Sequence, residues 1–135
     1  MSVDRLLEEE VQNKVDTDWA KMGFKDGVVY ATYKAIDVDL DAAEKVTEER
    51  KKLHEGISAL LICDVSQMKS VSKEARTYFS VHGSESLKAT AMIIASGFNT
   101  MLANFFMRVN FKKPPVPTKV FTNIEDAKKW VEQYR

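Results

Sequence analysis

The sequence has few of the residues that carry nucleophilic and metal chemistry. Its 135 residues include one cysteine, Cys63, and two histidines, His54 and His82. A lone cysteine excludes an intramolecular disulfide and is typical of a protein in the reducing cytoplasm. Two separated histidines do not make a metal-binding group. We therefore expect a cytoplasmic protein with no metal site and no cofactor.

Long apolar runs and glycine-rich phosphate loops are also missing. No window approaches the length of a membrane span, and the acidic residues 1–10 lack the apolar segment of a signal peptide. With twenty basic and twenty acidic residues, net charge gives no reason to expect a nucleic acid or a membrane surface as a partner. The absence of a phosphate loop or an activated nucleophile argues against an enzyme.

The balanced charge hides an uneven distribution along the chain. Residues 1–60 carry nine Lys and Arg against fourteen Asp and Glu, whereas residues 61–135 carry eleven against six. Opposite charges on the two halves would support head-to-tail self-association or a weak anion site. The alternative is uneven decoration of solvated faces, because the placement of surface charges is loosely constrained.

Hydrophobic residues make up 44% of the chain, which is enough for one core. Along the chain, segments with the apolar spacing of a strand alternate with segments that have the spacing of a helix. Asp26-Gly27 predicts a hairpin turn, and Thr122 with Glu125 predicts a capping box. The expected strands are 17–24, 27–36, 58–65, 89–95 and 118–121, and the expected helices are about 40–53, 72–82, 99–110 and 122 onward. The order ββαβαβαβα predicts one α/β domain over 1–135, with a mostly parallel five-stranded sheet, an opening antiparallel hairpin, about four helices and a flexible or helical lead over 1–15.

The most informative segment is the unbroken apolar run at 59–63, which ends in Asp64 and is followed by a serine-bearing turn. Such a run is typical of a central strand buried on both faces. The strand brings the polar turn to the carboxyl edge of the sheet, where ligand and regulatory sites of open α/β sheets collect. This pattern predicts where function lies but names no reaction.

The strand order and the segment 61–75 resemble the STAS fold, named after sulfate transporters and anti-sigma-factor antagonists. In that family the corresponding strand ends in an Asp-aliphatic-Ser step, to which Asp64-Val65-Ser66 is similar. A later Asp-Ser-Ser-Gly turn carries a serine that a partner kinase phosphorylates. Aligning Asp64 with the family's first aspartate places 72–75 at that turn and Lys73 at the phosphoacceptor position. The segments 104–106, 117–121 and 127–130 look more like a STAS-like branch of small uncharacterised bacterial proteins.

The resemblance implies a non-enzymatic regulatory or protein-interaction module that lacks the usual phosphoacceptor serine. Its partner loop would contain Asp64, Ser66, Ser70, Ser72, Lys73 and Glu74. Ser72 is also the expected N-cap of a helix, and a phosphate at Ser66, Ser70 or Ser72 would lie at a helix N-terminus, where it is favoured. Asp64 either serves the site or accepts hydrogen bonds from loop N–H groups.

A second candidate site is an aromatic and methionine stripe that covers too much of a helix to be hidden by one sheet face. It consists of Phe98, Met101, Phe105, Phe106, Met107, Arg108 and Phe111, and Lys112, Lys113 and Lys119 add to its basic rim. Such clusters mark protein interfaces or apolar ligand grooves, although ordinary core is the alternative. The stripe predicts a homodimer, and the identity of any other protein partner is unknown. Alternatively, the protein is a carrier of a small apolar or lipid-like ligand.

The remaining reactive residues are expected to be structural. His54 and His82 each lie near a helix end, where they would cap the helix or face solvent. Cys63 lies inside the apolar strand, so its thiol should be buried, inert and of high pKa.

Overall fold

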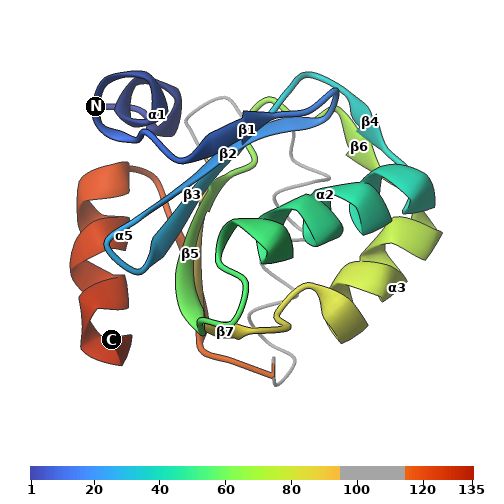
Figure 1. Ribbon diagram of the computed structural model, residues 1–135. Helices are drawn as coiled ribbons and strands as arrows, with labels where there is room; N and C mark the ends of the chain where they lie inside the picture. The colour runs from blue at the N-terminus through green and yellow to red at the C-terminus, as the bar shows by residue number, and fades with distance from the viewer. Residues whose placement is uncertain (95–114) are drawn as a thin grey trace.

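A six-stranded mixed sheet with helices on both faces organises the described part of the chain (Figure 1). The structure is a computed structural model and describes residues 1–94 and 115–135. From one edge to the other, the sheet contains β1 (Lys14–Asp16), β2 (Ala20–Lys25), β3 (Val28–Tyr33), β5 (Ala59–Asp64), β7 (Leu87–Ile93) and β8 (Thr118–Phe121). The strands β1, β2 and β3 are antiparallel, and β3, β5, β7 and β8 are parallel.

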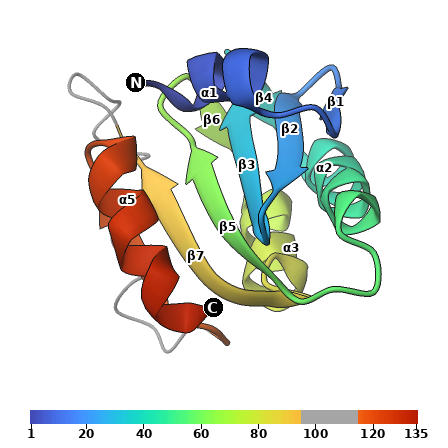
Figure 2. The same ribbon diagram turned by 60° about the vertical axis from the view of Figure 1, so that its left-hand side comes forward.

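The two faces of the sheet are covered by different helices, as the turned view in Figure 2 shows. α1 (Val3–Glu10) and α5 (Ile124–Val131), with the 3-10 helix η1 (Glu132–Tyr134), cover one face; α2 (Leu40–Leu53) and α3 (Lys73–His82) cover the other. The central strand β5 alternates between them, since Leu60 and Ile62 pack toward α1 and α5. Leu61 and Cys63 pack toward α2 and α3. The predicted central strand is therefore buried on both faces.

The opening hairpin forms at the predicted turn. Asp26 and Gly27 join β2 to β3 with φ angles of 51° and 81°. Both angles lie in the left-handed region, which a two-residue hairpin turn requires and which Asp-Gly tolerates. The predicted mainly parallel sheet with an opening antiparallel hairpin is confirmed.

Two details differ from the sequence prediction. The sheet has six strands rather than five, because β1 is a three-residue edge strand with exposed Lys14 and Asp16 and so shows no apolar period. A second sheet of two strands, β4 (Asp37–Val38) and β6 (Ser70–Val71), is too short for any periodicity to reveal. Of the two forms expected for the lead over 1–15, the structure has the helical one: it contains α1, whose buried Val3, Leu6 and Leu7 pack on the sheet.

The predicted capping box at the last helix is wrong by one residue. The N-cap of α5 is Asn123, whose side-chain oxygen accepts a hydrogen bond from the Asp126 backbone N–H at 2.9 Å. Glu125 instead contacts the amino group of Met1 at 3.3 Å. Asn is as good an N-cap as Thr, so composition could not separate the two registers. The predicted helix over 99–110 lies outside the described residues.

Candidate functional site at the carboxyl edge of the sheet

The loop that follows β5 is fixed to the core by three apolar side chains. Val65, Met68 and Val71 are exposed by only 2%, 4% and 9%, and all three belong to the core under α2 and α3. Gln67 and Lys69, which lie between these anchors, are exposed. Every third side chain from 65 to 71 is therefore packed in the core, which fixes the loop in place while the polar side chains between them face outward.

Backbone hydrogen bonds tie the same loop to the segment that leads into α2. β6 pairs with β4 in parallel, with Ser70 opposite Asp37 and Val71 opposite Val38. The N–H of Lys69 donates to the carbonyl oxygen of Ile36, and the N–H of Ser72 donates to that of Val38, both at 2.9 Å. Figure 1 shows β4 and β6 side by side next to the starts of α2 and α3. The small sheet thus couples the two helices at their N-terminal ends.

Both helices begin with a side-chain cap at this edge. Asp39 accepts a hydrogen bond from the Ala42 N–H at 2.9 Å, and the Ser72 hydroxyl oxygen accepts one from the Ala75 N–H at 3.1 Å. Ser72 is therefore the N-cap of α3, as its position before the helical pattern predicts. Lys73, which the sequence alignment predicts at the STAS phosphoacceptor position, is the first residue of α3 and is exposed.

A short hydrogen bond joins the two segments on the surface. The Ser70 hydroxyl donates to a carboxylate oxygen of Asp37 at 2.6 Å, and both residues are exposed. Asp64, at the end of β5, is half-buried and accepts a hydrogen bond from the Ser66 N–H at 2.9 Å. Asp64 thus accepts a hydrogen bond from a loop N–H group, which is one of its two expected roles. Its other expected role, in binding a partner, stays a prediction.

The candidate loop residues lie together at one edge of the sheet. Ser70, Lys73 and Glu74 are exposed there, whereas Asp64, Ser66 and Ser72 are half-buried. We use the name loop surface for the exposed side chains of this edge, which include two residues, Asp37 and Gln67, that were not predicted. Asp37 was missed because only the pairing of β4 with β6 brings it here. The loop surface consists of Asp37, Gln67, Lys69, Ser70, Lys73 and Glu74.

The other reactive residues of the sequence occupy structural positions. Burial raises the pKa of the Cys63 thiol well above its usual value, and the charge of Asp64 adds to that effect. His82 lies at the end of α3 and contacts Glu85 at 2.8 Å. His54 is the C-cap residue of α2, which was one of its two expected positions, but its side chain is only 2% exposed, which was not expected. Among residues 1–94 and 115–135, no group of three or more His, Cys, Asp or Glu side chains is placed to hold a metal ion.

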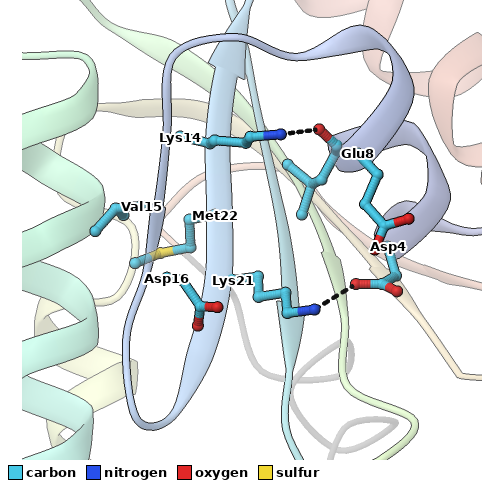
Figure 3. A pocket seen from close by; sticks show the side chains of 8 residues that line it. Asp4, Glu8, Lys14, Val15, Asp16, Lys21 and Met22 are labelled. Carbon is cyan, nitrogen blue, oxygen red and sulfur yellow. Dashed lines mark hydrogen bonds and ion pairs between the residues drawn. The ribbon is translucent and has the colours of Figure 1, made fainter.

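Among the hollows that the described residues form, two are lined largely by charged side chains. The larger one, of about 310 Å³, lies between α1 and the strands β1 and β2 (Figure 3). There Lys21 donates to Asp4 at 3.3 Å (Figure 3). Lys14 donates to the backbone carbonyl of Leu7 at 3.1 Å. Its lysines are thus engaged with α1. The smaller one, of about 190 Å³, is lined by Lys51, Lys52, His54, Glu55, Gly56 and Ser86.

The aromatic stripe predicted as an interface or ligand patch, from Phe98 to Phe111, lies outside the described residues. The homodimer and the apolar carrier that it predicts therefore stay predictions from the sequence. In the part of the chain that the structure describes, no helix is both long and apolar enough to span a membrane.

Comparison with known proteins places the chain in a family. It belongs to the DUF7793 family, a domain of unknown function, whose sequence pattern matches residues 22–135. It is also similar to the crystal structure of an uncharacterised protein of the DUF3478 family from Shewanella loihica PV-4, which has a SpoIIAA-like fold. The identity is 14%, the TM-score is 0.58, and the match covers 86% of this chain and 98% of the other. At that identity the likeness shows the fold alone. No curated protein matches the chain in sequence.

Proposed function

We propose that this protein is a non-catalytic regulatory module that binds a partner protein through the loop surface. The observation that carries the proposal is the construction of the loop, in which Val65, Met68 and Val71 are buried while Gln67, Lys69 and Ser70 face outward. A recognition loop that is already held in place loses less conformational entropy on binding. The single free cysteine fits a cytoplasmic setting for such a module.

The chemistry of the loop surface favours a polar partner with interspersed charges. Two carboxylates, from Asp37 and Glu74, lie among two ammonium groups, from Lys69 and Lys73, with neutral Gln67 and Ser70 beside them. Mixed charges of this kind set specificity and association rate more than affinity. The partner should present complementary charges rather than an apolar groove. A second copy of this chain is one candidate for that partner.

Regulation by phosphorylation would differ from that of the anti-sigma-factor antagonists that the fold resembles. The sequence alignment predicts Lys73 at their phosphoacceptor position, and the Ser72 oxygen accepts a hydrogen bond from the Ala75 N–H at the start of α3. Ser70 is the serine whose modification would change the surface most. A phosphate there would replace a donor to Asp37 by a dianion, and like-charge repulsion would separate β6 from β4.

A photo-crosslinking amino acid at Gln67, in cells that make the protein naturally, tests the proposal. The matched control carries the same amino acid at Lys128, which is exposed on α5 at the other face of the sheet. We expect a discrete crosslinked product from position 67 alone; a product of twice the chain's mass would identify a second copy. Lys69→Glu should weaken the product, whereas Ser80→Asp, at an exposed serine on α3, should not. No product at position 67, or the same products at both positions, would contradict the proposal.

A further inference from the structure

A buried arginine joins the C-terminal ends of α2 and α3. Arg50 is only 4% exposed, and its Nη2 group lies 3.4 Å from the carbonyl oxygen of Gly83, the residue that ends α3. Its Nη1 group lies 2.9 Å from Nε2 of His54. Within residues 1–94 and 115–135, no carboxylate forms an ion pair with this guanidinium. The buried charge of Arg50 is therefore stabilised by hydrogen bonds to neutral acceptors, the imidazole of His54 and the carbonyl oxygen of Gly83.

The hydrogen bonds of His54 are compatible with one protonation state only. An arginine side chain has donors and no acceptor, so Nε2 of His54 must accept from Arg50 and carry no proton. Nδ1 lies 2.8 Å from the carbonyl oxygen of Ile57 and must therefore carry the proton and donate. A second proton on the ring would abolish the bond to Arg50 and would place two cations next to each other in a buried site.

The surroundings of the pair disfavour that second proton. Burial lowers the pKa of His54, and the charge of Arg50 adds to that effect. The aromatic ring of Phe24 in β2 lies 5.9 Å from the His54 ring, centre to centre, and supplies no charge. The titratable groups that act on the pair are Arg50 and Lys51 from α2, Tyr33 from β3, Cys63 from β5, and Tyr78 and Glu85 from α3 and the turn after it.

None of these neighbours changes charge just below neutral pH. The pKa values of Tyr33, Tyr78 and Cys63 are raised, chiefly by burial, so these side chains stay neutral. A hydrogen bond from His82 lowers the pKa of Glu85, which therefore stays anionic. Arginine and lysine side chains are cationic throughout this range. The only other histidine, His82, lies on the surface beside Glu85.

We propose that Arg50 and His54 form an acid-sensitive latch, which holds the C-terminal ends of α2 and α3 together at neutral pH and releases them when His54 takes up a proton. The released segments would be the turn from His54 to Ile57 and the turn after Gly83. These turns precede β5 and β7, where the Ala59 N–H donates to the Ser86 carbonyl oxygen at 3.0 Å. The latch is separate from the loop surface, so it does not rest on the proposed function.

Nuclear magnetic resonance of the intact protein tests the latch directly, because the chain has two histidines and His82→Gln leaves one. We expect the His54 ring at pH 7.5 to carry its proton on Nδ1 and to titrate below pH 6.5, the ordinary value for histidine. Amide-exchange protection at Ile57 and Gly83 should fall along with the titration of the His54 ring, below pH 6.5, after correction for intrinsic exchange. Protection at Val65 and Ile94, whose N–H groups bond to Ile93 and Phe121, should fall less.

Variants distinguish the latch from general acid sensitivity. His82→Gln should keep the acid-induced loss of protection, whereas His54→Gln should lose it, since glutamine does not titrate. A proton on Nε2 of His54, titration at or above pH 6.5, or equal loss of protection at all four amides would overturn the proposal. The first two results need only wild-type protein and His82→Gln, so they decide the matter even if His54→Gln does not fold.

Discussion

Truncation of Met68 should separate the anchoring of the loop from the chemistry of its surface. Met68 is 4% exposed and packs in the core under α2 and α3. Met68→Ala removes three buried heavy atoms, at roughly 0.8 kcal/mol each for the transfer from water. A residual cavity adds to this cost, and buried Met→Ala substitutions span about 2–5 kcal/mol. Because a loop relaxes more easily than a helix or strand, we expect a loss of about 2–3 kcal/mol.

Urea unfolding followed by circular dichroism measures this loss, and Gln67→Ala is the matched control. Gln67 is the exposed neighbour of Met68, so its truncation should change stability by less than about 0.5 kcal/mol. If the loop surface binds a partner, Met68→Ala should also weaken crosslinking from position 67, although it alters no exposed side chain. Equal losses for the two variants, or a negligible loss for Met68→Ala, would refute the view that this side chain fixes the loop.

Three further outcomes are expected. Gly23→Ala should cost about 1–3 kcal/mol by overpacking, since a Cβ atom at Gly23 would lie 2.6 Å from Val11 and 2.8 Å from Leu7; thermal melting measures this, and an unchanged melting temperature would contradict it. Ser72→Ala should cost about 1 kcal/mol in urea unfolding, whereas Ser72→Asp, which keeps a capping oxygen, should cost little. Sedimentation should reveal a dimer that Phe106→Glu disrupts, and a wild-type monomer at every concentration would remove the aromatic stripe as a dimer contact.

The sequence predicted those parts of the fold that repeat a strong pattern. The run at 59–63 has no polar residue, which only a strand buried on both faces tolerates, and β5 is such a strand. Asp26-Gly27 has the chemistry of a tight turn, and Ser72 precedes a helical period, so both were predictable locally. These features depend on neighbours within a few residues of each other.

The parts that were missed depend on contacts between distant residues. Asp37 and Ser70 are 33 positions apart, and only the folded chain places them in hydrogen-bond distance. The pairing of Arg50 with His54 was equally hidden. Arg50 recurs at the helical spacing of buried Ala43 and Val46, but nothing in the local pattern shows which acceptors a buried arginine would find there. The loop surface could therefore be located from the sequence, but neither its full membership nor the buried pair could.

A double-mutant cycle can show whether the loop surface and the proposed latch act on each other. The Ser70–Asp37 bond lies at the start of α2 and the Arg50–His54 pair at its end. The intervening helix, Leu40–Leu53, spans about 20 Å at 1.5 Å per residue. Sites this far apart usually contribute to stability additively within about 0.5 kcal/mol. The stability losses of Ser70→Ala and His54→Gln at pH 7.5 should therefore add in the double variant.

The result carries information in either direction, because α2 and α3 contact both sites. The β4–β6 hydrogen bonds are made by backbone atoms that do not depend on the protonation of His54, so release at one end of the helix pair should leave the other end closed. Additive losses would mean that acid opens one end without disturbing the loop surface. A coupling energy above about 1 kcal/mol would contradict this independence. It would mean that α2 and α3 move as rigid bodies and that acid at one end alters recognition at the other.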